Sequence, residues 1–133
     1  MPRSLKAATT VVDNLPFEDL YDLVDGSDFL VCNIEAPYEE EFATVRTTGI
    51  RQLSLGFLRP CIIQREHAEY YGFSERNAVI YERGELAQAL LRATDMPAAE
   101  YDAMCRELDA LRQEVEHRSL ANLERAIVGK ELL

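Results

Sequence analysis

The sequence predicts an α/β fold, namely a three-layer, Rossmann-like domain with a small parallel sheet of about four strands and a long C-terminal helix. Short apolar runs typical of buried strands alternate with amphipathic runs typical of helices, and this order favours a parallel sheet with helices on its faces. The chain has 133 residues, of which 47% are hydrophobic, enough for one domain with a core. We therefore expect a single domain over residues 1–133, with residues 1–10 flexible.

Four apolar runs are the strand candidates. The run "TTVVDN" (9–14) is the weakest, and "FLVCNI" (29–34) is the strongest, because its nearly unbroken apolar character suits a central parallel strand. The run "PCIIQ" (60–64) is a second buried strand, with Pro60 at its start, where the missing N–H does least harm. The run "NAVIY" (77–81) is a third strand of the same buried type.

The segments between these strands predict helices. Helices are expected over residues 16–28, 47–58 and 83–94, whereas residues 65–73 form a short helix or an ordered loop. A long closing helix is expected over residues 97–128, opened by a proline and ended by Gly129. The apolar side chains at helical spacing that we expect to face the core are Phe17, Leu20, Leu23, Val24, Ile50, Leu53, Phe57, Leu58, Leu86, Ala89, Leu90 and Ala93.

The charge and cysteine content argue against several classes of function. The formal net charge is −10 and the basic residues form no stripe, so we expect no nucleic-acid partner. The three cysteines fit neither a disulfide framework nor a zinc pattern, which favours a reducing, cytoplasmic compartment. No segment has the length and apolar character of a membrane span. We expect neither a metal nor a cofactor.

The segment "VRTTG" is the main candidate for a binding site. It lies in the connection after the predicted strand 29–34, and ligands of parallel α/β sheets bind beyond the carboxyl ends of the strands. A helix start presents unpaired N–H groups, Thr47 or Thr48 supplies a hydroxyl, and Gly49 permits close approach of a ligand. Arg46 adds a planar cation. The other interpretation is that a threonine is an ordinary N-cap and Arg46 neutralises the glutamates before it.

Two further residues are candidates for ligand contact at the same edge. Glu41, in the acidic loop "EAPYEEEF", either accepts hydrogen bonds from a sugar or is a solvated loop charge. His67 follows the second buried strand, although a lone histidine is more often a surface residue or a satisfied core residue. The chain has no nucleophile elbow, Walker loop or dinucleotide fingerprint, so catalytic residues are left unassigned.

Three short motifs stand in a characteristic order along the chain. Residues 27–28 ("SD") precede the strongest strand, residues 56–62 ("GFLRPCI") contain a stretched G-x-P pattern before the next strand, and residues 85–87 ("ELA") open a late helix. This order resembles the C-terminal, nucleotide-sugar-binding domain of GT-B glycosyltransferases, and the similarity covers roughly residues 11–95.

The resemblance implies a binding site for a nucleotide-activated sugar donor. The residues that would face the phosphates or the sugar are Arg46, Thr47, Thr48 and Gly49, and Glu41 matches an acidic residue just before a turn in the family. The chain departs from the retaining members at position 49, where they carry a ribose-binding glutamate. GT-B enzymes transfer the sugar in a cleft between two domains. The resemblance therefore implies that this chain is inactive alone and is part of a longer or a two-component glycosyltransferase, in which an N-terminal domain binds the acceptor.

A different class of function is suggested by the closing helix. Its apolar residues recur at alternating three- and four-residue steps, the spacing of a coiled-coil seam: Tyr101, Met104, Leu108, Leu111 and Val115. In one interpretation this seam packs on the protein's own sheet. In the other it pairs with a second chain, and the protein is a non-catalytic interaction module that forms a homodimer or larger oligomer.

Overall fold

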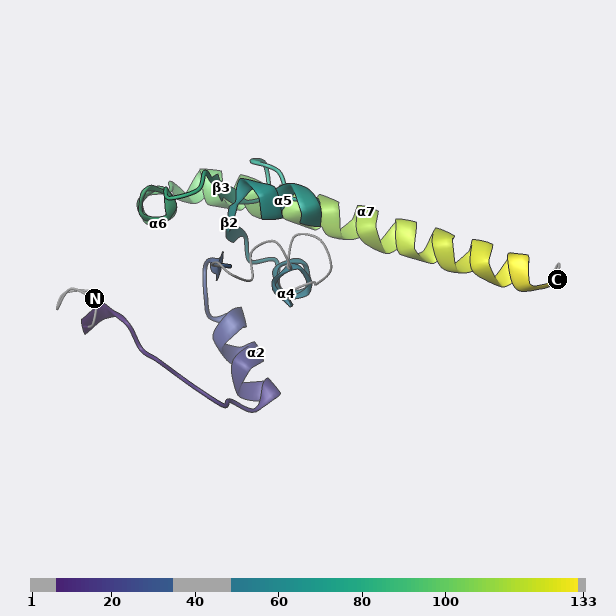
Figure 1. Cartoon of the computed structure of the whole chain (residues 1–133), viewed down its shortest axis with the longest axis horizontal. Helices are drawn as coiled ribbons and strands as arrows, with labels where there is room; N and C mark the ends of the chain where they lie inside the picture. The colour runs from purple at the N-terminus through teal and green to yellow at the C-terminus, as the bar shows by residue number, and fades with distance from the viewer. Residues whose placement is uncertain (1–6, 35–48, 132–133) are drawn as a thin grey trace.

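The computed structural model describes residues 7–34 and 49–131, which form an α/β fold with a three-stranded parallel sheet and a long C-terminal helix (Figure 1). The strands are β1 (Leu30–Cys32), β2 (Cys61–Gln64) and β3 (Val79–Tyr81). They lie side by side in the order β1-β2-β3, and each pair is parallel. The predicted fold class is therefore confirmed at the level of a small parallel sheet with helices around it.

The helices occur where amphipathic spacing predicts them. In chain order they are α2 (Phe17–Asp25), α4 (Ile50–Phe57), α5 (Arg65–Tyr71), α6 (Leu86–Thr94) and α7 (Ala98–Glu131). Residues 65–71, for which the sequence allows a helix or a loop, are helical, and the turn ends at Gly72 with a φ of 80°, a conformation that glycine adopts without strain. Proline stands immediately before α2 and α7, as its fixed φ and missing N–H favour.

The strands separate the core into two clusters because successive side chains of a strand point to opposite faces. On one face, Cys61 and Ile63 of β2 pack with residues of α4, α5 and α7, including the fully buried Leu108. On the other face, Ile62 packs with α6. Every residue of β2 and β3 is buried, as their apolar runs predict.

The predicted seam of the closing helix packs against the protein's own core. Met104 belongs to the cluster on the α6 side of the sheet. Leu108 belongs to the cluster on the opposite side, and Leu111 and Val115 pack against that same cluster. The Tyr101 hydroxyl donates a hydrogen bond to the carbonyl of Asp28 at 2.8 Å, and its ring lies edge-on to Phe29 at 5.3 Å. Of the two interpretations of residues 101–115, the structure therefore supports core packing.

The predicted strands are confirmed only in part. Residues 9–14 form no strand, and the described residues form three of the about four strands expected. The strand β1 is shorter than the run 29–34 and lies at the edge of the described sheet instead of its centre. The side chain of Val31 is 46% exposed, and α6 makes its main sheet contacts with β2 and β3. An apolar run indicates a buried strand but not its place in the sheet.

The predicted core faces of the helices also need correction. In α2 only Val24 is buried, whereas Phe17 and Leu23 are exposed, because α2 packs on α4 through the rings of Tyr21 and Phe57 and not on the sheet. In α4 the most buried residues are Ser54 and Leu55, and the residues predicted to face the core are half-buried. Leu90 of α6 is exposed as well.

The end of the closing helix differs from the prediction. Gly129 does not end α7, which continues to Glu131, three residues beyond the predicted boundary at 128. Glycine inside a helix costs about 1 kcal/mol relative to alanine, which weakens a helix without obliging it to stop. The preceding turns of good helix formers outweigh that cost.

Candidate functional site

The structure describes two of the six predicted site residues. Gly49 immediately precedes α4, and His67 lies within α5. The other four predicted residues, Glu41, Arg46, Thr47 and Thr48, lie outside the described residues. Among the described residues, the candidate site therefore consists of the start of α4 and the side chains around it.

The backbone N–H groups of Arg51 and Gln52, in the first turn of α4, are capped by no described side chain. Gly49 is the N-cap residue and has helical dihedral angles, with a φ of −69° and a ψ of −8°, and its carbonyl accepts the N–H of Leu53 at 3.1 Å. A Cβ placed on Gly49 would meet no atom of the described residues within 4 Å. The first turn contains no acidic side chain. A helix start of this kind attracts an anion through its N–H groups and its partial positive charge.

The start of α4 lies beside the end of α5. The Nε of Arg51 donates a hydrogen bond to the carbonyl of Tyr71 at 3.0 Å. These two helix ends and α7 border a groove of about 380 Å³. The groove is lined by Arg51, Gln52, Glu69, Tyr70, Tyr71, Gly72 and Arg118. Sequence reasoning placed the ligand at the carboxyl ends of the strands. The groove instead lies beside the last residue of α5, Tyr71, to which the start of α4 is hydrogen-bonded.

The groove carries an excess of positive charge in an acidic chain. Arg51 and Arg118 contribute two guanidinium groups against the single carboxylate of Glu69, whereas the whole chain has a net charge of −10. One N–H of Arg51 is used by the Tyr71 carbonyl, and Nη2 of Arg118 donates to Glu114 at 2.7 Å. Each guanidinium has five N–H donors, so both retain donors for an oxyanion.

The side chain of His67 is not part of this groove. It is only 1% exposed, and neither ring nitrogen has a hydrogen-bond partner among the described residues. A buried polar group without a partner costs about 1–3 kcal/mol, so this residue is energetically unfavourable where it lies. The ring is therefore shielded from solvent, and its predicted contact with a ligand stays a prediction.

The carboxyl ends of β2 and β3 are occupied by internal ion pairs. Arg65 donates to the carboxylate of Glu82 and, at 3.0 Å, to that of Glu75, and these hydrogen bonds raise the pKa of Arg65 further. The side-chain amide of Gln64 donates to Glu66 at 2.8 Å, and this hydrogen bond is the main reason that the pKa of Glu66 is lowered. With its guanidinium shared between two glutamates, Arg65 is poorly placed to hold a phosphate.

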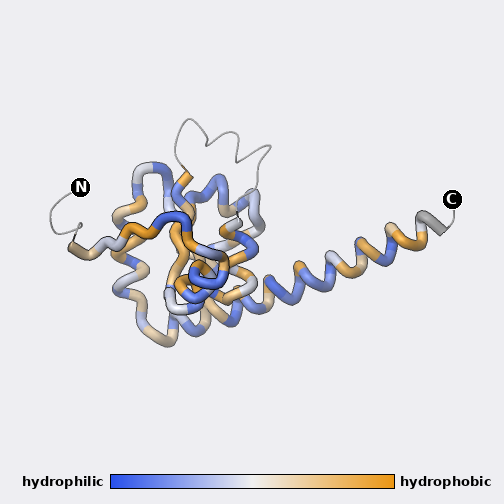
Figure 2. Tube along the Cα trace, turned by 90° about the horizontal axis from the view of Figure 1, so that it is seen from below, coloured by the Kyte–Doolittle hydropathy of each residue, from blue (hydrophilic) through white to orange (hydrophobic). Residues whose placement is uncertain are grey.

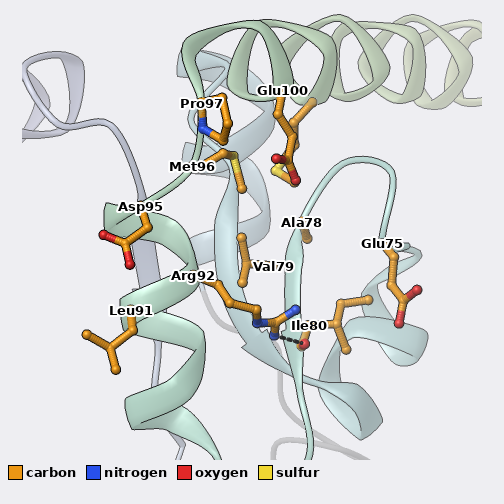
Figure 3. A pocket seen from close by; sticks show the side chains of 11 residues that line it. Glu75, Ala78, Val79, Ile80, Leu91, Arg92, Asp95, Met96, Pro97 and Glu100 are labelled. Carbon is orange, nitrogen blue, oxygen red and sulfur yellow. Dashed lines mark hydrogen bonds between the residues drawn. The ribbon is translucent and has the colours of Figure 1, made fainter.

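A second cavity, of about 500 Å³, lies along the outer edge of β3 (Figure 3). Arg92 of α6 reaches across it and donates to the carbonyl of Ile80 at 2.7 Å, which covers part of the strand edge. Three carboxylates line the same cavity: Glu75, Asp95 and Glu100. With one guanidinium against three carboxylates, this cavity suits a cation and repels a phosphate.

Cysteine, metal and membrane features give no competing site within residues 7–34 and 49–131. The three cysteines are free, and burial raises the pKa of Cys61 to about 12, which makes this thiol unreactive at neutral pH. That part of the chain contains no group of three or more residues arranged to hold a metal ion. None of its helices combines the length and the apolar character that crossing a bilayer requires.

The two arginines that distinguish the groove were missed by sequence reasoning. Arg51 and Arg118 are 67 positions apart in the chain, and no local motif links them. The one available signal was the position of Arg51, two residues after Gly49 at the end of the "RTTG" segment. Comparison with protein-family models, with curated proteins and with solved structures finds no match for this chain.

Proposed function

We propose that the chain is a donor-binding domain that holds the phosphate groups of a nucleotide-activated sugar in the groove at the start of α4. One observation carries the proposal. In a chain with a net charge of −10, two arginines from distant segments line one groove beside a helix start without a described side-chain cap. Helix N–H groups and guanidinium forks are the two devices that proteins use most for binding phosphate.

Each part of the groove has a distinct role in this proposal. The backbone N–H groups of Arg51 and Gln52 bind phosphate oxygens, and the guanidinium groups of Arg51 and Arg118 balance the charge of the phosphates. The side chain of Tyr70, which is half exposed, offers a ring on which a base or sugar can pack. The predicted contacts from Arg46, Thr47 and Thr48 come from the residues that immediately precede this helix start.

The proposed activity belongs to an assembly larger than this domain. We take the two core clusters as the two faces of a three-layer, Rossmann-like unit of the GT-B C-terminal type, completed by a fourth strand. Transfer of the sugar requires an acceptor domain on the other side of the groove, so this chain alone binds the donor without turning it over. The free cysteines support a reducing, cytoplasmic location.

Isothermal titration calorimetry with nucleoside-diphosphate sugars, nucleoside diphosphates and pyrophosphate tests this function. We expect binding by the wild type and an affinity about tenfold lower for Arg46→Ala, because a charged hydrogen bond contributes about 1.5–3 kcal/mol. Absence of binding to every compound, or equal affinity of wild type and Arg46→Ala, rejects the proposal.

A second candidate function is that of a non-catalytic interaction module that oligomerises through its C-terminal helix. A specific observation favours it: the last turns of α7 carry large apolar side chains that remain exposed, among them Leu120 and Leu123. These residues follow the seam at 101–115, which the protein's own core occupies. Sedimentation equilibrium tests this function, since an interaction module of this kind associates with increasing concentration and an isolated donor-binding domain does not.

A further inference from the structure

The last thirteen residues of α7 project away from the rest of the protein. Val115 is the last α7 residue that packs against a core cluster, and Arg118 is the last that lines the groove. Residues 119–131, which we call the arm, continue as helix beyond the other described elements (Figure 1). At 1.5 Å per residue the arm is about 20 Å long.

The arm carries a row of exposed apolar side chains. The exposed fractions are 55% for Leu120, 57% for Leu123, 49% for Ile127 and 53% for Val128. Figure 2 shows apolar stretches alternating with polar ones along the free part of the helix. Leu120, Leu123 and Ile127 are spaced by three and four residues, the spacing at which apolar side chains of two helices interlock.

The apolar row of the arm is not a continuation of the row that packs on the core. Successive residues are 100° apart around a helix. The centre of the row formed by Leu120, Leu123 and Ile127 is therefore rotated by about 120° from that of Met104, Leu108, Leu111 and Val115. If α7 were only extended past its own domain, its apolar side chains would stay in a single row along the helix. The rotated row therefore indicates a different packing partner.

The distribution of charge favours a second copy of this chain as that partner. The arm contains two acidic residues, Glu124 and Glu131, and two basic residues, Arg125 and Lys130, so its net charge is zero. The net charge of −10 therefore resides entirely outside the arm. Two copies of this chain therefore repel each other over most of their surface, and the uncharged arms are exempt from this repulsion.

We propose that the arm pairs antiparallel with the arm of a second copy of this chain and forms a weak homodimer. We call the part of each chain before the arm its body. Antiparallel pairing places the two acidic bodies at opposite ends of the arms, about 20 Å apart, and this distance exceeds the screening length of about 8 Å at physiological salt. Parallel pairing brings the bodies together and is opposed by their charge. The inference rests on the second candidate function and is independent of donor binding.

Sedimentation equilibrium on the full chain at concentrations from about 10 to 500 µM tests the dimer, because pairing of two short arms buries less surface than stable complexes do. The mass is expected to rise from 15.1 kDa toward twice that value. Leu123→Glu abolishes the rise without unfolding the chain, because its side chain is exposed. The matched control is Leu91→Glu on α6, where the leucine is 64% exposed and the rise persists.

Two results overturn the inference, and only one of them also rejects the function as an interaction module. A monomer at all concentrations rejects both the arm dimer and the interaction module. Association that Leu123→Glu leaves unchanged rejects the arm dimer and leaves an oligomer formed by another surface.

The direction of pairing is tested separately with a spin label. The label is placed on Ser119→Cys in a chain that carries Cys105→Ser. A distance of about 20 Å or more between the two labels supports antiparallel arms. A distance below about 10 Å shows parallel arms and overturns the proposal.

Discussion

At the residue scale, burial decides what the titratable and polar side chains can do. Ser54 is fully buried, and its hydroxyl donates to the carbonyl of Arg59 at 2.7 Å, so its polar atom is satisfied. Asn77 is similarly buried, and its side-chain oxygen accepts the N–H of Ser74 at 2.9 Å. His67 is the exception in this group, because neither of its ring nitrogens has a partner among the described residues. The two arginines of the groove remain accessible and therefore carry the proposed function.

Replacing His67 by leucine is expected to stabilise the protein. The substitution His67→Leu removes two unpaired polar atoms from the core, so the free energy of unfolding rises by about 1 kcal/mol. Urea unfolding measures the change. The matched control is Asn77→Leu, which removes the hydrogen bond that the Asn77 side chain accepts from the N–H of Ser74 and lowers the free energy of unfolding by about 1–3 kcal/mol. A loss of stability in His67→Leu similar to that of the control contradicts the description of His67.

The thiol of Cys61 is expected to make stability depend on alkaline pH. Burial is the main cause that raises the pKa of Cys61 from 9.0 to about 12, and a hydrogen bond with Ser54 opposes it. The stability from the neutral thiol is thus complete below pH 9 and is lost as the pH rises from 9 toward 12. Urea unfolding at pH 8 and pH 10 should show a smaller decrease in Cys61→Ala than in the wild type. Equal decreases in the two proteins contradict the burial of this thiol.

At the element scale, the sequence predicts the identity of the helices and strands better than their surroundings. The run 60–64 was correctly identified as a buried strand, because an unbroken apolar run with a leading proline fits few other structures. The run 29–34 has the same character, yet β1 lies at the edge of the described sheet, because the place of a strand depends on long-range pairing that no local pattern records. The groove was missed for the same reason, since Arg51 and Arg118 meet only through the packing of α4 on α7.

The two parts of α7 are expected to respond differently to the same substitution. Leu108 is fully buried between the helices and the sheet, so Leu108→Ala lowers the free energy of unfolding by about 2–5 kcal/mol. Leu123 is exposed on the arm, so Leu123→Ala changes it by less than about 0.5 kcal/mol at a concentration where the chain is monomeric. Urea unfolding at low protein concentration compares them. Equal losses would mean that the arm packs on the body.

At the scale of the whole molecule, charge separates three regions with different chemistry. The body is acidic and the arm is neutral, whereas the groove at the start of α4 has two arginines against one glutamate. The cavity along β3 has the opposite balance, with one arginine and three carboxylates. An anion that approaches this protein is repelled by the net charge of the chain, and among the described residues the groove offers it two guanidinium groups.

Titration of pyrophosphate into the full chain and its variants, followed by calorimetry, is the most direct test of the donor-binding function. Arg118→Gln is expected to lower the affinity for pyrophosphate about tenfold, because it removes one of the two cations of the groove. Arg125→Gln, seven residues further along α7 and outside the groove, is expected to leave the affinity unchanged. If the wild type binds no pyrophosphate, or if both variants weaken binding equally, the groove at the start of α4 is not a phosphate site.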